Sequence, residues 1–178
     1  TNGDVTGNVS NFTSGISARV FKDGNWGFSS NPEINKGSIA SAVKASTDNV
    51  QFMNQKDTTR CGIFLPETQA NYEMDFTSKK THQEQKFWVD FVRDIDGYIA
   101  EKYPELLSRN VVIGGLDMEK TLFTSDGSES YSMTPRGLLY IMVTIEKDGV
   151  PVSLMDAWGG LGQLEDKFHE PSEFYSEV

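Results

Sequence analysis

Cysteine and histidine are scarce in this 178-residue chain, which has one cysteine and two histidines. A lone Cys61 cannot form an internal disulfide, which is typical of a protein from a reducing compartment. A zinc site draws its ligands from Cys, His and carboxylates at short spacings, and His82 and His169 lie far apart. Glu170 follows His169, but the second histidine of a zincin helix is missing at positions 173 and 174. We therefore expect no metal site in this chain.

Basic runs and long apolar runs are also lacking. The formal net charge is −10, and the densest basic pair is Lys79–Lys80. An acidic surface repels phosphate backbones and anionic lipid, so we expect neither nucleic-acid nor membrane binding. No apolar run approaches the ~20 residues that span a bilayer. The first residues contain no basic stretch followed by an apolar one, so we expect no signal peptide. We expect a cytoplasmic protein whose start at Thr1 was cut from a longer chain.

Catalytic motifs are missing as well. The sequence has no nucleophile elbow, Walker loop or dinucleotide fingerprint. Apolar residues follow Cys61, which favours a buried core thiol over a nucleophile. The acidic pairs Asp94/Asp96 and Glu165/Asp166 are typical of solvated faces. The residues alone therefore predict no catalytic, cofactor-binding or metal-binding side chain.

The first half of the chain predicts a hairpin and two helices. Residues 16–30 alternate around an Asp-Gly turn, as in a β-hairpin. Residues 37–53 have a helical period with Ser38 as the N-cap, and their small side chains indicate close packing on a sheet. Residues 81–102 carry one apolar stripe behind a Thr81–Glu84 capping box.

The second half predicts strands. The expected strands lie at 111–113, 119–123, 138–146 and 150–158. Turns are expected at 124–128 and 147–149, and a helix is expected from residue 164. Residues 61–66 and 72–76 are expected to be extended. We predict an α+β fold with two main helices on one face of a largely antiparallel sheet.

Residues 1–178 are expected to form one N-terminal domain. The sequence Lys-Asp-Gly recurs at 22–24 and 147–149, so an internal duplication into halves near 1–80 and 81–178 is an alternative to chance recurrence of a common turn.

Three aromatic residues near turns, Trp26, Phe28 and Trp158, are assigned to the core. The alternative is a groove that binds an extended peptide at a sheet edge.

Residues 15–30 read GISARVFKDGNWGFSS. This segment resembles the signature G-v-x-x-R-V-x-x-d-G-x-w-G-F-a-s of the TldD/PmbA family, once called modulators of DNA gyrase. Residues 123–127 are similar to a second family element, f-x-n-S-e-G. The matching residues, expected to define the fold, are Gly15, Arg19, Gly24, Gly27, Phe28, Ser125 and Gly127.

The resemblance implies an N-terminal α/β domain that precedes a β-rich domain. The catalytic member of the family binds zinc through an HExxxH helix and a later cysteine, all beyond the end of this chain. Family subunits pair as dimers, including heterodimers, and act on peptides held extended in a chamber. No catalytic, cofactor or metal residue carries over, and zinc is expected only in the full-length catalytic member.

Three hypotheses follow for the function. The chain is the chamber and dimerisation domain of a peptidase, and is inactive alone. The alternative is a non-catalytic module that binds a peptide or protein, as a partner-type subunit or gyrase modulator. The third is a domain with only a structural role.

Overall fold

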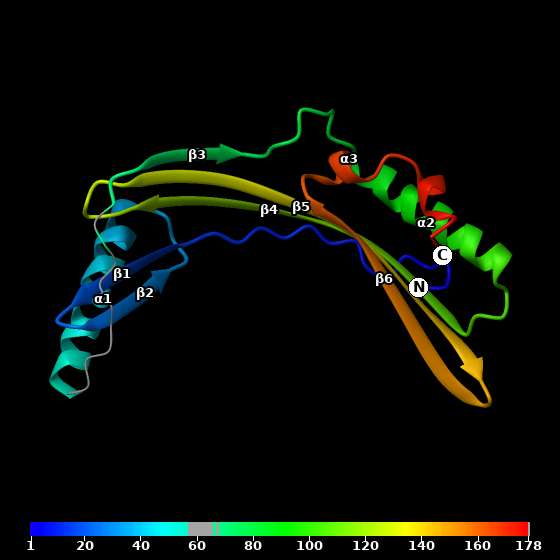
Figure 1. Cartoon of the computed structure of the whole chain (residues 1–178), viewed down its shortest axis with the longest axis horizontal. Coiled ribbons are helices and arrows are strands. Elements are labelled where there is room, and N and C mark those ends of the chain that lie inside the picture. Colours follow the sequence, from blue (N-terminus) through cyan, green and yellow to red (C-terminus); the bar gives the residue numbers. More distant parts are fainter. Residues whose placement is uncertain (57–65, 67, 178) are drawn as a thin grey trace. The chain divides into compact units, whose positions relative to one another are not determined.

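The computed structural model describes residues 1–56, 66 and 68–177, and it confirms the α+β class. The predicted strand at 61–66 and the environment of Cys61 lie outside the described residues. The chain divides into two compact units, which we call the hairpin unit (residues 9–67) and the sheet unit (residues 1–8 and 68–178). Each unit has its own sheet and one long helix (Figure 1).

The hairpin unit contains β1 (Ile16–Lys22), β2 (Asn25–Asn31) and α1 (Lys36–Lys56). The two strands pair antiparallel through all seven residues, as predicted. The predicted N-cap of α1 is wrong. Ser38 lies buried inside the first turn, and its backbone N–H donates to the side-chain oxygen of Asn35 at 2.8 Å. Asn35 precedes the helix and is therefore the residue that caps it.

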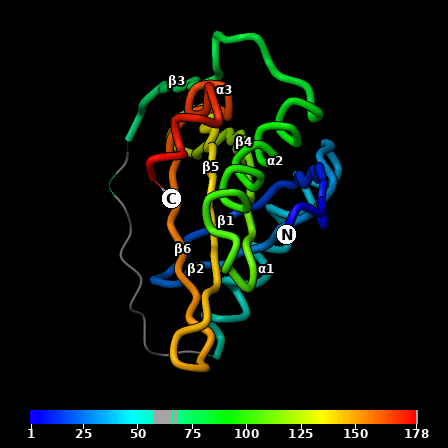
Figure 2. Tube along the Cα trace, turned by 90° about the vertical axis from the view of Figure 1, so that its right-hand side faces the viewer, coloured from blue at the N-terminus to red at the C-terminus, as the bar shows by residue number. Residues whose placement is uncertain are grey.

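The sheet unit is built on a meander of β4 (Ser108–Phe123), β5 (Glu129–Lys147) and β6 (Val150–Leu161). The separate strands predicted at 111–113 and 119–123 are one continuous strand. β3 (Asn71–Asp75) pairs parallel with the start of β5, so the sheet is mixed. In Figures 1 and 2 the β5–β6 hairpin extends past the end of α2.

β3 and β6 pair with the same side of β5 and end head to head beside Pro135. The backbone N–H of Phe76 donates to Met133, and that of Gly162 donates to Pro135 at 2.9 Å. The N–H and C=O groups of one antiparallel strand residue point to the same side. The donor that proline lacks would therefore lie at the junction where both neighbouring strands end, which explains a proline within a central strand.

The core of the sheet unit lies between the sheet and three helical segments: α2 (Gln85–Lys102), α3 (Leu164–Lys167) and the 3₁₀ turn η1 (Pro171–Phe174). The apolar stripe predicted for α2 packs against β5, as Figure 2 shows for the two backbones. The buried cluster consists of Trp88, Phe91, Ile95, Ile99, Leu139, Ile141, Phe168 and Phe174. Trp158 packs against this cluster, as predicted. No helix among the described residues is long and apolar enough to cross a membrane.

Two further predictions fail in the sheet unit. Helix α2 begins at Gln85, with Glu84 as its N-cap and no capping box from Thr81. Asp96 is predicted to be solvated but is buried, and its carboxylate faces Arg109 of β4 at the edge of the core. The Arg109 Nε and Asp96 Oδ1 atoms lie 2.9 Å apart. The N–H of Nε makes no hydrogen bond, so the contact is an ion pair without hydrogen-bond geometry.

Candidate functional site

The glycines of the 15–30 segment occupy positions that other residues fit poorly. Asp23 and Gly24 have φ of 52° and 87° and form the two-residue turn of the hairpin. A Cβ on Gly27 would lie 2.0 Å from the carbonyl oxygen of Ser46 on α1. A Cβ on Gly15 would lie 2.9 Å from the carbonyl oxygen of Asn31. These three glycines therefore set the turn, the helix–sheet contact and the base of the hairpin.

Ser46 joins α1 to β1 at this close approach. The side chain is buried, and its hydroxyl lies 2.9 Å from the carbonyl oxygen of Ala18 and 2.8 Å from that of Ala42. At the far end of the hairpin, the Asn54 amide donates to the carbonyl oxygen of Lys22 at 3.1 Å and accepts from the Asn25 amide. Small and polar residues thus hold α1 close to both strands.

Arg19 and Phe28 lie on the other face of the hairpin, directly opposite each other on β1 and β2. Phe21 and Trp26 form the next pair on this face, with ring centroids 5.0 Å apart. Trp26 is 41% exposed and Phe28 53% exposed, so the prediction that they belong to the core is wrong. We call these four residues the aromatic face. Period-2 alternation places these side chains on one face, because Gly27 faces α1 and its neighbours along β2 point the other way.

Residues 124–128 form the turn between β4 and β5, which contains Ser125 and Gly127. Gly127 has φ of 93°, and its N–H donates to the carbonyl oxygen of Thr124 at 3.1 Å. The Asp126 carboxylate accepts from the Thr124 hydroxyl and from the backbone N–H of Thr68 at 2.8 Å. These two hydrogen bonds, with Thr124 the stronger, hold the pKa of Asp126 below 3.8. The turn therefore fixes the segment that enters β3, through Asp126, a residue that sequence reasoning missed.

A second polar group, which we call the α3 latch, holds the segment between β3 and α2 against α3. Ser78 Oγ donates to Asp166 Oδ1 at 2.7 Å, and the N–H of Gln83 donates to Glu165 Oε1 at 2.8 Å. Lys80 Nζ donates to the carbonyl oxygen of Glu165 at 2.9 Å. The prediction that Glu165 and Asp166 form a solvated face is wrong, because both carboxylates accept bonds from a segment more than 80 residues away.

Both histidines lie beside this latch. His82 Nδ1 is 3.0 Å from Glu165 Oε1, and the Glu165 side chain is only 4% exposed. His169 Nε2 is 3.5 Å from Lys80 Nζ. A helix that began at Thr81 would place His82 in its first turn. Instead, His82 precedes α2, and its side chain is largely exposed. No group of three His, Cys, Asp or Glu side chains among the described residues is placed to hold a metal ion.

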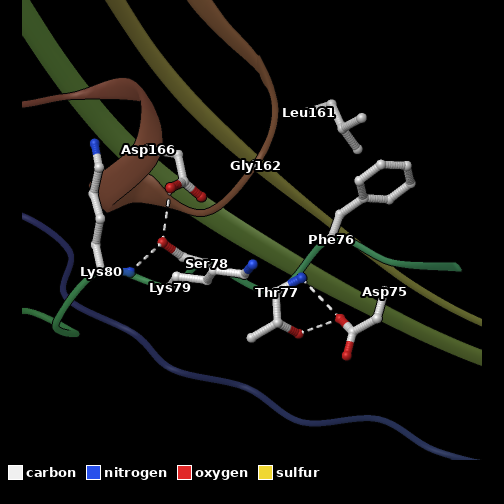
Figure 3. A pocket seen from close by; sticks show the side chains of 9 residues that line it. All are labelled: Asp75, Phe76, Thr77, Ser78, Lys79, Lys80, Leu161, Gly162 and Asp166. Carbon is white, nitrogen blue, oxygen red and sulfur yellow. Dashed lines mark hydrogen bonds between the residues drawn. The ribbon is translucent and has the colours of Figure 1, made fainter.

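A shallow cavity of about 490 Å³ adjoins the latch at the β3–β6 junction. Residues 75–80, Leu161, Gly162 and Asp166 line it (Figure 3). Thr77 donates to Asp75 from its backbone N–H at 2.8 Å and from its hydroxyl at 2.5 Å, which lowers the pKa of Asp75. As Figure 3 shows, Asp166 is bonded to Ser78. Neighbouring residues thus engage both carboxylates, and the arrangement stabilises the loops.

Comparison with known proteins relates part of the sequence to a known family. Residues 1–50 match the family model described as PmbA/TldA metallopeptidase domain 1. This part of the chain is therefore similar to the first domain of the PmbA/TldA metallopeptidases.

The fold of the chain also has a solved counterpart. A crystal structure of a candidate modulator of DNA gyrase from Bacteroides thetaiotaomicron matches it with a TM-score of 0.65 at 14% sequence identity. The match covers 92% of this chain and 38% of that one, so the domain spans about two fifths of the length of its structural counterpart. At this identity the match shows a shared fold. No curated protein matches the sequence.

The family match covers the hairpin and most of α1, which places five motif residues in the matched region. Within the matched residues, the three glycines have the steric roles described above. Arg19 and Phe28 occupy the aromatic face of the hairpin, where Phe28 is exposed. Ser125 and Gly127 lie beyond the matched residues, in the β4–β5 turn.

Proposed function

We propose that this chain is the chamber-lining and dimerisation domain of a TldD/PmbA-type peptidase, and that it does not hydrolyse peptides by itself. The observation that carries the proposal is the family match over residues 1–50, whose description names a metallopeptidase domain 1. In this proposal, zinc and its ligands belong to the complete gene product. Its substrate is a peptide, and its partner is a homo- or heterodimeric subunit of the same family.

The exposed face of the larger sheet supports a role in lining or contact. Strands β4, β5 and β6 bury one face against α2 and leave the other open. The open face is rich in exposed apolar side chains: Leu116, Leu138, Met142, Met155 and Leu161. Large exposed apolar patches mark surfaces that bind protein or ligand. A sheet face of this kind suits a chamber wall or a subunit contact better than a solvated surface.

A non-catalytic regulatory module is the second candidate. Two observations favour it: the solved counterpart is described as a candidate modulator of DNA gyrase, and the hairpin unit presents the aromatic face. Exposed aromatic residues beside an arginine are common at protein-binding surfaces. In this reading the chain, or its parent as a partner-type subunit, binds a peptide or protein without cleaving it.

Zinc content and peptidase activity separate these proposals. Both are measured for the 178-residue chain and for the product of its complete gene, with a quenched fluorescent peptide library and with chelator as control. We expect bound zinc and chelator-sensitive cleavage only in the complete product. Cleavage by the 178-residue chain would contradict the proposal, and absence of zinc and cleavage from both would favour the regulatory module.

A further inference from the structure

We infer that the open face of the larger sheet selects peptide segments that combine apolar side chains with carboxylates, and that Arg136 and Lys120 determine this preference. The inference rests on the proposed role of the domain as a chamber wall. It adds the side-chain chemistry of the peptide that the wall receives.

The strand register assigns each residue of the sheet to one face. Leu139 of β5 is buried in the core with α2, so the odd-numbered residues of β5 face the helices and the even-numbered ones face away. Ile113 of β4 and Trp158 of β6 both pair with Leu139 and pack against the same core. The open face therefore carries the even-numbered residues of β3, β4 and β5 and the odd-numbered residues of β6.

Charge is divided unequally between the two faces. Among the strand positions, all of which the structure describes, the open face carries Lys120 and Arg136, and its one carboxylate is Glu146 at the tip of the β5–β6 hairpin. The helix side carries two cations, of which Arg109 is paired with Asp96. It also carries most of the strand carboxylates: Glu73, Asp75, Asp117, Glu119, Glu129 and Asp156. In a chain of net charge −10, the open face thus stands out as cationic.

The two cations of the open face are available to a ligand. Both are exposed, and neither forms an ion pair with a carboxylate in the part of the chain that the structure describes. Arg136 lies opposite Leu116 of β4 and Leu161 of β6, which are 54% and 47% exposed. A guanidinium between two exposed leucines can bind a carboxylate and contact apolar side chains at the same place.

The spacing of the cations indicates the spacing of the carboxylates that would bind them. Lys120 lies opposite Ser132, which precedes Arg136 by four residues along β5. A strand rises about 3.3 Å per residue, so the two cations lie about 13 Å apart along the sheet. Leu138 is the next residue of β5 on this face, and its neighbours across the sheet are two glycines, at positions 114 and 159. We therefore expect an extended segment with carboxylates about four residues apart and apolar side chains beside them.

A peptide suits this face better than an anionic membrane or a nucleic acid. Those surfaces carry many phosphates, which a chain of net charge −10 repels. Two cations on an apolar face match a ligand with two carboxylates. A short peptide meets this requirement without bringing further negative charge near the acidic remainder of the chain.

The test compares three fluorescent peptides by anisotropy with the 178-residue chain. The first contains leucine, serine and two glutamates four residues apart, and its counterparts carry glutamine or lysine in place of each glutamate. We expect the glutamate peptide to bind about three- to tenfold more tightly than the glutamine peptide, and the lysine peptide to bind least tightly. The differences should shrink at high salt, because the charges are exposed.

Charge reversal assigns the preference to this face. R136E/K120E should reverse the order, so that the lysine peptide binds most tightly. K22E/K36E changes the net charge equally at exposed lysines of the hairpin unit and should leave the order unchanged. L138S should weaken the binding of all three peptides, whereas L154S, at an exposed leucine on the helix side, should not. Circular dichroism verifies that the variants fold.

Three results would overturn the inference: no binding of any peptide, equal binding of all three, or an unchanged order in R136E/K120E. Binding of phosphatidylglycerol vesicles in place of the peptides would overturn the assignment to a peptide. The zinc and peptidase measurements on the complete gene product test the proposed function separately. Cleavage without a preference for glutamate would refute this inference alone, whereas glutamate-selective binding without zinc or cleavage would support it and refute the peptidase.

Discussion

Gly27 of β2 lies directly against Ser46 of α1, so that a Cβ at position 27 would be 2.0 Å from the Ser46 carbonyl oxygen and 2.8 Å from the Val50 nitrogen. Both neighbouring atoms belong to the helix backbone and cannot rotate away. The contact explains how a two-stranded sheet, which is marginally stable alone, becomes part of a folded unit.

Replacing Gly27 with alanine should therefore separate α1 from the hairpin. We expect G27A to lower the free energy of unfolding of the hairpin unit by about 3 kcal/mol or more, which is at the upper end for an overpacked site. Urea unfolding followed by circular dichroism, with hydrogen exchange of α1 as a local probe, measures the loss.

Gly97 provides the matched control. It lies inside α2, and apart from the adjacent backbone of that helix no atom comes within 4 Å of the position that a Cβ would take. G97A should raise stability by about 0.5–1 kcal/mol, because glycine is unfavourable within a helix. Equal effects of G27A and G97A would show that the close approach of Gly27 is unimportant.

The elements that meet at Gly27 also show which features of the fold can be predicted from the sequence. Alternation around Asp23–Gly24 predicts the hairpin, and the small residues of α1 predict close packing on a sheet, because both signals are local. The pairing of Arg19 with Phe28 follows once the turn is known. Their exposure could not be predicted, because an aromatic residue on a strand fits a buried face equally well.

The α3 latch shows why other features were missed. The segment Thr81–Glu84 reads as a capping box, but Gln83 donates its N–H to Glu165, 82 residues away. A contact so distant leaves no local pattern. Glu165 and Asp166 likewise read as a solvated pair, because a buried carboxylate is recognised only by its partners. The parallel pairing of β3 with β5 depends on the same kind of long-range contact.

The buried ion pair should make a large, context-dependent contribution. D96A leaves Arg109 buried without a counter-ion, and we expect a loss of about 2–3 kcal/mol, below the fully buried value because both side chains retain some exposure. The double variant D96A/R109A should lose less than the sum of the single variants. The exposed pair Lys44–Asp48 serves as the control, since D48A should cost less than about 0.5 kcal/mol. Additive losses would show that Asp96 and Arg109 do not interact.

The turn at Asp126 should titrate below its ordinary range. Thr124 and Thr68 donate to the carboxylate and lower its pKa from 3.8, so their contribution to stability is present above that pH and is lost as pH falls through the folded-state value. T124V should raise the pKa of Asp126 toward 3.8. Carbon-detected NMR titration of the side chain measures both midpoints. T77V is the control, because Thr77 lowers the pKa of Asp75 instead. A midpoint of Asp126 that T124V leaves unchanged would contradict the assigned cause.

Removing the carboxylate of Glu165 should release the segment that precedes α2. Glu165 accepts from the N–H of Gln83 and contacts His82, and the alanine variant leaves that N–H without its partner. A lost hydrogen bond of this kind costs about 1–3 kcal/mol, so amide exchange at Gln83 should become roughly tenfold faster or more. Hydrogen-exchange mass spectrometry over residues 77–84 measures the change, with E170A, at an exposed carboxylate near η1, as the control. Equal exchange in E165A and E170A would mean that the latch does not hold this segment, whereas faster exchange confined to E165A would identify α3 as its anchor.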